Sequence, residues 1–155
     1  MARIKQTRTL LGFDYGSNHI GVAVGQELTA TAWPLVTLAT RNQRPDWDAI
    51  GRLIEDWRPD LLIVGVPYHA DGSASSMTSS ARRFSRQLMD RYGLVVDTMD
   101  ERLSSVEAED FISRFQQAPR RRQDKCRVDQ VAAALILESW FNHQKTSAIC
   151  QIPNS

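Results

Sequence analysis

A continuous run of large apolar residues, Leu61-Leu62-Ile63-Val64, lies between two segments of helical periodicity. Apolar residues recur every three or four positions from residue 47 to residue 57, and again from residue 81 to residue 88. A strand that is apolar on both faces is typical of a parallel sheet, because helices cover both sides of such a sheet. The run therefore predicts a buried parallel strand in an α/β domain.

The chain before this run has a different pattern. Segments 10–15, 20–24 and 28–38 read as strands joined by short breaks, and short breaks favour an antiparallel meander. Pro34 places the third strand at an edge of the sheet. Residues 94–96 supply a fifth strand. Right-handed crossovers then give an RNase H-like α/β fold, with a mixed five-stranded sheet (three antiparallel strands, then two parallel) and helices on both faces.

Two further helices are expected after the fifth strand. Ser104 and Glu107 form a capping box that begins one of them. Residues 128–141 form the other, which is apolar on nearly all sides and is therefore expected to be buried. The expected organisation is a basic tail at 1–8, a single RNase H-like domain at 9–143 and a polar C-terminal tail at 144–155.

The composition suits one globular domain. Of the 155 residues 42% are hydrophobic, which is enough for a core without disulfides. Cys126 and Cys150 have no CxxC or zinc spacing. No apolar run approaches the roughly 18 residues that span a bilayer, and the basic start lacks the apolar stretch of a signal peptide. We therefore expect a cytoplasmic protein without a membrane partner.

The net charge of +1 does not by itself indicate a nucleic-acid-binding protein. The basic residues instead gather in short groups. Such groups are more often solvated surface than binding sites, so alone they only suggest a polyanionic partner. The groups are Arg3, Lys5 and Arg8; Arg82, Arg83 and Arg86; and Arg120, Arg121, Arg122, Lys125 and Arg127.

Acidic residues from distant parts of the sequence are expected at one edge of the sheet. Asp14 ends the first strand, Glu101 follows the fifth, and Asp129 lies near the start of the last helix. Ligands of such sheets bind beyond the carboxyl ends of the parallel strands. Carboxylate oxygens suit Mg²⁺ or Mn²⁺, and these ions promote phosphodiester hydrolysis. The three acids are thus predicted to be both the metal ligands and the catalytic residues of a nuclease.

Each acid also has a purely structural interpretation. An Asp at a strand end often forms a turn, Glu101 has Arg102 as a neighbour, and an acid in a first helical turn stabilises the helix dipole. The small residues Ala132 and Ala133 favour the metal-site interpretation for Asp129. They let the last helix lie close to the sheet, and an acid buried there needs a cation.

Basic and polar residues near these acids are predicted to contact nucleic acid. Lys125 and Arg127 precede Asp129, and Arg122 belongs to the same basic segment, so these cations are expected to bind phosphates. Ser73 and His69 lie in the Gly- and Ser-rich loop after the fourth strand, at the same edge. An exposed loop without a binding role is the alternative for these two residues.

Four segments resemble, in order, motifs of the YqgF family, also called RuvX. They are GFDYGSNHIGVAVG, VGVPYHADG, DERLSSVEAE and KCRVDQVAAALILE, and together they cover most of the chain. The resemblance implies a fold close to that of Holliday junction resolvases, with catalytic acids at Asp14, Glu101 and Asp129. It also implies a nuclease that matures the 5′ end of the pre-16S ribosomal RNA, with the ribosome as a partner.

Other functions stay open at this point. Junction resolution is one, although the resolvases carry an acid after the fourth strand where this chain has Val66-Pro67. The segments Asp14-Tyr15-Gly16 and Ile20-Gly21-Val22 also resemble the phosphate loop of sugar kinases and actin-like ATPases, which need a second domain. A non-catalytic nucleic-acid-binding domain would not need converging acids, which repel one another. Both a monomer and a homodimer are open, and junction resolution would favour the homodimer.

Overall fold

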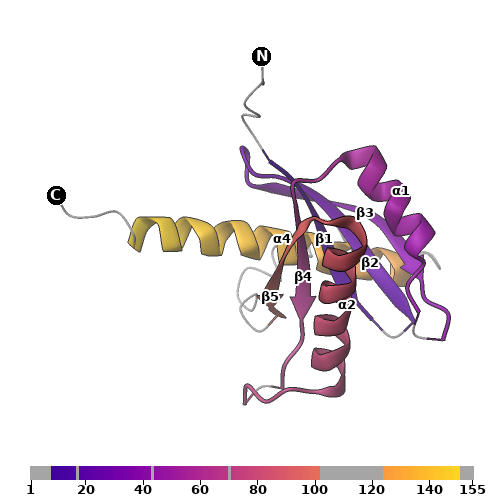
Figure 1. The fold of residues 1–155 in the computed structure, drawn as a ribbon. Coiled ribbons are helices and arrows are strands. Elements are labelled where there is room, and N and C mark those ends of the chain that lie inside the picture. Colours follow the sequence, from indigo (N-terminus) through magenta and orange to yellow (C-terminus); the bar gives the residue numbers. More distant parts are fainter. Residues whose placement is uncertain (1–7, 17, 43, 70, 102–123, 151–155) are drawn as a thin grey trace.

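The computed structural model describes residues 8–16, 18–42, 44–69, 71–101 and 124–150, the last range with side chains for 129–144. Five strands form one sheet in the order β3-β2-β1-β4-β5 (Figure 1). Strands β1, β2 and β3 pair antiparallel, whereas β4 pairs parallel with both β1 and β5. The predicted mixed sheet is confirmed. Its strands are β1 (Thr9–Tyr15), β2 (His19–Gln26), β3 (Thr31–Ala39), β4 (Leu61–Val66) and β5 (Val95–Asp100).

Helices cover both faces of the sheet. α1 (Trp47–Trp57) and α2 (Ser76–Tyr92) lie on one face, and α4 (Asp124–Cys150) crosses the other (Figure 1). Each face has its own apolar layer, because side chains alternate along every strand. Leu10 and Ile63 pack towards α4, whereas Phe13 and Val64 pack towards α1 and α2. Across the described residues, no helix combines the length and apolarity needed to cross a membrane.

Local signals fix the ends of α2. The Ser75 side chain accepts a hydrogen bond from the Thr78 N–H at 3.2 Å, and the Ser75 N–H donates to the Thr78 hydroxyl at 2.8 Å. The buried Thr78 hydroxyl also donates to the carbonyl of Pro67, which ties the helix start to the loop after β4. Gly93 ends the helix in the left-handed conformation at φ 64°, which glycine adopts readily.

The edge strand β3 carries the irregularity that Pro34 imposes. Val22 pairs with Val36 and Ala23 with Pro34, so Leu35 is the extra residue of a β-bulge. Proline has no N–H to donate to a sheet ladder, and an edge position avoids this loss. The predicted edge position of this strand is confirmed.

The last helix is longer than predicted. α4 begins at Asp124 and continues to Cys150, so residues 144–150 are helical rather than an irregular tail. No proline or glycine interrupts this stretch, and the next helix-breaking residue is Pro153. The helix expected after Ser104 lies outside the described residues.

The fifth strand also continues beyond its predicted apolar core. It ends at Asp100, so Asp97 lies in the middle of β5 opposite Ile63 and not at a strand end. The Asp97 carboxylate accepts hydrogen bonds from the Trp140 indole N–H at 3.0 Å and the Thr98 N–H at 2.9 Å. These bonds make Asp97 a structural link between β5 and α4, distinct from the acids beyond the end of the strand.

Candidate active site

Asp14 lies near the carboxyl end of the central strand β1, on the face that α4 covers. Strand alternation fixes this direction, because Leu10 and Gly12 face α4 and Phe13 faces α1 and α2. The Asp14 side chain is half-buried. A carboxylate is thus held at the centre of the sheet, beneath the first turns of the last helix.

Two glycines stand on either side of Asp14. Gly21 of β2 and Gly65 of β4 are its partners in the two neighbouring strands. A Cβ atom on Gly21 would lie 2.0 Å from the carbonyl oxygen of Asp129, and a Cβ on Gly65 would lie 2.8 Å from Oε1 of Glu101. Only glycine allows these approaches, so the two glycines provide the space in which the acids gather.

Asp14 and Glu101 form a hydrogen-bonded carboxyl pair. Burial, together with the nearby charge of Glu101 and the hydrogen bond to it, raises the pKa of Asp14 to about 8. Burial also raises the pKa of Glu101, although the hydrogen bond from Asp14 acts in the opposite direction. A hydrogen bond between two carboxyl groups requires a proton, so without a cation Asp14 donates that proton to the Glu101 carboxylate.

Asp129 approaches the pair from α4. It lies in the second turn of this helix, which begins at Asp124, so a helix-dipole role in the first turn does not explain its position. Burial raises the pKa of Asp129, and its charge adds to the rise in the pKa of Asp14. Across the residues that the structure describes, no three Asp, Glu, His or Cys side chains are close enough to hold a metal ion. The structure thus joins Asp14 to Glu101 and brings Asp129 within electrostatic reach.

Three neighbours of these acids were missed by the sequence reasoning. Gly21 and Gly65 shape the space around Asp14, and glycines inside strands are a known signal of close backbone approach. His19 lies at the start of β2, two residues before Gly21 and hence on the same face. Its positive charge lowers the pKa of Asp129. Residues two apart on a strand share a face, so the position of His19 relative to Gly21 in the sequence could have identified this histidine as a neighbour of the acids.

The predicted phosphate-binding cations have only a partial structural description. Lys125 and Arg127 belong to the first turn of α4, just before the turn that carries Asp129. The helix backbone therefore places both near the acids, while their side chains lie outside the described residues. Arg122 also lies outside them.

The loop between β4 and α2 holds Ser73 and His69. Both are exposed, and the His69 N–H donates to the Ser73 carbonyl at 3.0 Å. The Ser73 hydroxyl and N–H both donate to the Asp71 carboxylate, at 2.6 and 2.9 Å. Since the Ser73 donors are satisfied within the loop, Ser73 shapes the loop, and His69 presents an exposed side chain beside it.

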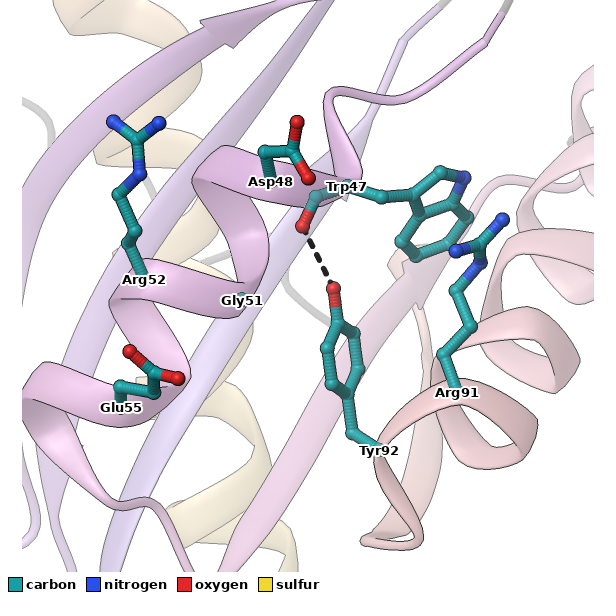
Figure 2. A pocket seen from close by; sticks show the side chains of 7 residues that line it. All are labelled: Trp47, Asp48, Gly51, Arg52, Glu55, Arg91 and Tyr92. Carbon is teal, nitrogen blue, oxygen red and sulfur yellow. Dashed lines mark hydrogen bonds between the residues drawn. The ribbon is translucent and has the colours of Figure 1, made fainter.

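A pocket of about 460 Å³ lies between α1 and α2, on the opposite face of the sheet from the acids (Figure 2). The Trp47 ring already has two partners there: Phe84 stacks on it with centroids 5.7 Å apart, and the Arg91 guanidinium lies 4.4 Å from its centroid. The Tyr92 hydroxyl donates to the Trp47 carbonyl at 2.8 Å. The charges around this pocket are of both signs, and we do not assign it to the reaction. Its lining residues are Trp47, Asp48, Gly51, Arg52, Glu55, Arg91 and Tyr92.

Comparison with known proteins places this geometry in context. The family model described as "RuvX: Holliday junction resolvase" matches residues 8–143. A protein of Nitrosococcus oceani named "Putative pre-16S rRNA nuclease" is 50% identical over 139 residues, which are 90% of each chain. A protein of the same name from Azotobacter vinelandii is 47% identical over 86% of this chain and 93% of its own.

Solved structures resemble the chain in fold. RuvC of Thermus thermophilus in complex with a Holliday junction substrate has a TM-score of 0.55 at 18% identity, covering 89% of this chain and 96% of its own. The yeast mitochondrial Holliday junction resolvase Ydc2 has a TM-score of 0.53 at 12% identity, and the match covers 90% of this chain and 80% of the resolvase. These likenesses agree with the sheet order and confirm the predicted RNase H-like fold.

Proposed function

The chain belongs to the RuvX family, and we propose that it is a nuclease that hydrolyses phosphodiester bonds with the help of divalent cations. The observation that carries the proposal is the carboxyl pair of Asp14 and Glu101, with Asp129 beside it. Burying like charges together costs free energy unless a proton or a cation compensates them. Such an arrangement is expected at a metal site and has no evident structural benefit.

The donor chemistry fits Mg²⁺ or Mn²⁺. Hard cations of this kind prefer carboxylate oxygens, and the acids here are Asp14, Glu101 and Asp129. In the metal-free protein, the proton between Asp14 and Glu101 supplies positive charge at the place where a bound cation would supply it. Gly21 and Gly65 leave the acids room that any larger residue would fill.

Each acid has a definite role in this proposal. Asp14 anchors the ion because it is fixed on the central strand, and Glu101, which follows β5, and Asp129 of α4 complete the ligand set. A bound divalent cation would activate water and stabilise the charge that develops on the phosphate. The cations Lys125, Arg127 and Arg122 bind the substrate backbone, and His69 contacts it from the loop after β4, whose shape Ser73 maintains.

The favoured substrate is the precursor of 16S ribosomal RNA, cut in the maturation of its 5′ end. The support is the name shared by the relatives that are 42–50% identical to this chain. We place the reaction in the cytoplasm, with the ribosome as a partner. The second candidate is a four-way DNA junction, which the Thermus RuvC structure contains. Val66 and Pro67 occupy the end of β4, where a resolvase carries an acid, and this favours RNA.

A cleavage panel tests the proposal. It contains a ribosomal precursor 5′ leader, unrelated single-stranded RNA, single-stranded DNA and a four-way DNA junction, each with Mn²⁺, Mg²⁺ or EDTA. Asp14→Asn removes the anchoring acid, and Asp56→Asn is a matched control at an exposed position of α1. Metal-dependent RNA cleavage that is lost only in Asp14→Asn supports the proposal.

The other outcomes separate the alternatives. Cleavage of the junction alone would replace ribosomal RNA by DNA junctions as the substrate. If the protein binds the ribosomal leader but does not cleave it, even when ribosomal particles are added, the result would indicate a non-catalytic domain. Saturable ATP binding without cleavage would favour the ATPase-like module.

A further inference from the structure

Three arginines form an exposed row on α2, which we call the arginine stripe: Arg82, Arg83 and Arg86. Arg86 lies about one turn after the neighbouring Arg82 and Arg83, with Arg82 and Arg86 separated by about 6 Å along the axis. Within the described part of the chain, neither Arg83 nor Arg86 forms a salt bridge. The stripe therefore presents positive charge that no described acid pairs with.

A contact with the loop after β4 orients the first arginine of the stripe. The Arg82 guanidinium lies 5.4 Å from the centroid of the Tyr68 ring, and it donates a hydrogen bond to the Tyr68 hydroxyl at 2.6 Å. Tyr68 itself pairs with Ala74 across the loop. The side chain of Arg82 is thereby held in place, which lowers the entropy lost when it binds a ligand.

The same loop connects the stripe to the acids. The Thr78 hydroxyl donates to the Pro67 carbonyl, so the first turn of α2 is fixed to the end of β4. On β4, Gly65 lies directly beside Asp14 of β1. The stripe begins beside this loop, at the carboxyl edge of the sheet, but α2 covers the face opposite the acids (Figure 1). A strand bound at the acids would therefore reach the stripe by passing around this edge.

Three other described arginines differ from the stripe. Arg8 pairs with Glu27 at 2.5 Å, and Arg91 stacks on Trp47. On α1, the exposed Arg52 is followed by Glu55, so the charges there alternate in sign. On α2, by contrast, residues 82–86 carry three arginines and no acid, and the next acid along the helix is Asp90.

We propose that the arginine stripe binds the phosphodiester backbone of the substrate, on the part of the strand that extends beyond the cleavage site. This inference rests on the proposed nuclease function and adds a second contact surface to it. Guanidinium groups bind phosphate through paired N–H donors and remain charged at every physiological pH. The stripe contacts the backbone and reads no bases, so it binds without regard to sequence.

Salt-dependent binding tests the proposal in an Asp14→Asn background, where substrate is not cut. Affinity is measured by fluorescence anisotropy over a range of salt concentrations, for a short oligonucleotide and for one extended on both sides of the same sequence. Arg83→Gln combined with Arg86→Gln removes the free charges, and Arg52→Gln on α1 is the matched control. Far-UV circular dichroism and thermal unfolding establish that each variant is folded.

The expected result is specific to extended substrates. The double variant should bind the extended strand on the order of tenfold more weakly at low salt, with a log–log salt slope shallower by about 1.5, since each lost phosphate contact removes about 0.7–0.9. The short oligonucleotide and the Arg52→Gln control should show unchanged affinity. An RNA strand and a DNA junction arm, tested in parallel, reveal which backbone the stripe prefers.

Two results would overturn the inference, and they are distinguishable. If the background protein binds both lengths with salt dependence and the double variant binds identically, the stripe is solvated surface and the nuclease proposal stands. If the background protein binds no RNA or DNA at all, the stripe proposal and the nuclease proposal fail together.

Discussion

Asp14 and Glu101 share a hydrogen bond between their carboxyl groups, across the space that Gly65 leaves beside the central strand. The pair connects β1 with the residue that directly follows β5, although β4 lies between these two strands. In the metal-free protein one proton occupies this pair at neutral pH, and each consequence of that proton can be measured.

The metal-free protein should lose stability as the pH rises. The folded-state pKa of Asp14 is raised to about 8, so between pH 4 and pH 8 the folded protein holds a proton that the unfolded chain has released. The free energy of unfolding should therefore fall across this window, by on the order of a few kcal/mol. Urea unfolding in EDTA at pH 5 and pH 8 measures the fall, and Asp14→Asn should flatten it. An equal stability at both pH values in the wild-type protein would refute the buried pair.

Divalent cations should reverse this loss at pH 8. Mn²⁺ or Mg²⁺ that binds only the folded protein stabilises it, by about 2.7 kcal/mol at a hundredfold excess over the dissociation constant. Thermal unfolding at increasing metal concentrations measures this stabilisation. Glu101→Gln should stabilise the metal-free protein at pH 8, because the glutamine amide can donate an N–H to ionised Asp14 and the pair then needs no additional bound proton. The same variant should lose the stabilisation by metal, because it lacks the Glu101 carboxylate. A full metal response in this variant would exclude Glu101 as a ligand.

Gly21→Ala should damage the site through the backbone. The new Cβ would lie 2.0 Å from the Asp129 carbonyl oxygen, so α4 must move away from the sheet. Overpacking of this kind costs about 1–3 kcal/mol, and cleavage should fall further because Asp129 moves with the helix. Gly51→Ala is the control. Its Cβ would come no nearer than 3.6 Å to Tyr92, and alanine favours a helix over glycine by about 1 kcal/mol. Equal effects of the two substitutions would contradict the close packing of α4.

Ser75→Ala should weaken the start of α2. The substitution removes the oxygen that accepts the Thr78 N–H, and loss of an N-cap costs about 1 kcal/mol. Ser76→Ala, at the exposed next position, should leave the free energy of unfolding nearly unchanged. Urea unfolding of both variants compares the two positions directly. A similar loss in both would mean that the cap does not fix the helix start.

Much of the fold follows from local pattern. The apolar run at 61–64 and the alternating segments before it predicted the sheet correctly, because strand period and connection length restrict the pairing. The meeting of Asp14 and Glu101 was also predictable, since Asp14 lies near the end of one strand and Glu101 directly follows another that runs in the same direction. The position of Asp129 needed the additional inference that the last helix lies close to the sheet.

Other features depend on tertiary packing and were not predictable. The small residues of α4 indicated a close approach, but the space comes from the sheet, where Gly12, Gly21 and Gly65 lie under the helix. Strand glycines also occur for other reasons, so their role is clear only once the helix is placed. The full length of α4 was underestimated because its polar end lacks the apolar period that identifies a buried helix.

The position of Asp129 on α4 has a consequence for synthesis of the protein. The five strands and Asp14 precede this helix in the sequence, so they leave the ribosome first. A nascent chain that has made its sheet still lacks the third acid, and it gains that acid only when α4 packs over the glycines. In our proposal the chain therefore cannot cut RNA until α4 has been translated and has packed against the sheet. If Asp129 is needed for cleavage as proposed, the protein becomes active only after its last helix has been synthesised and folded.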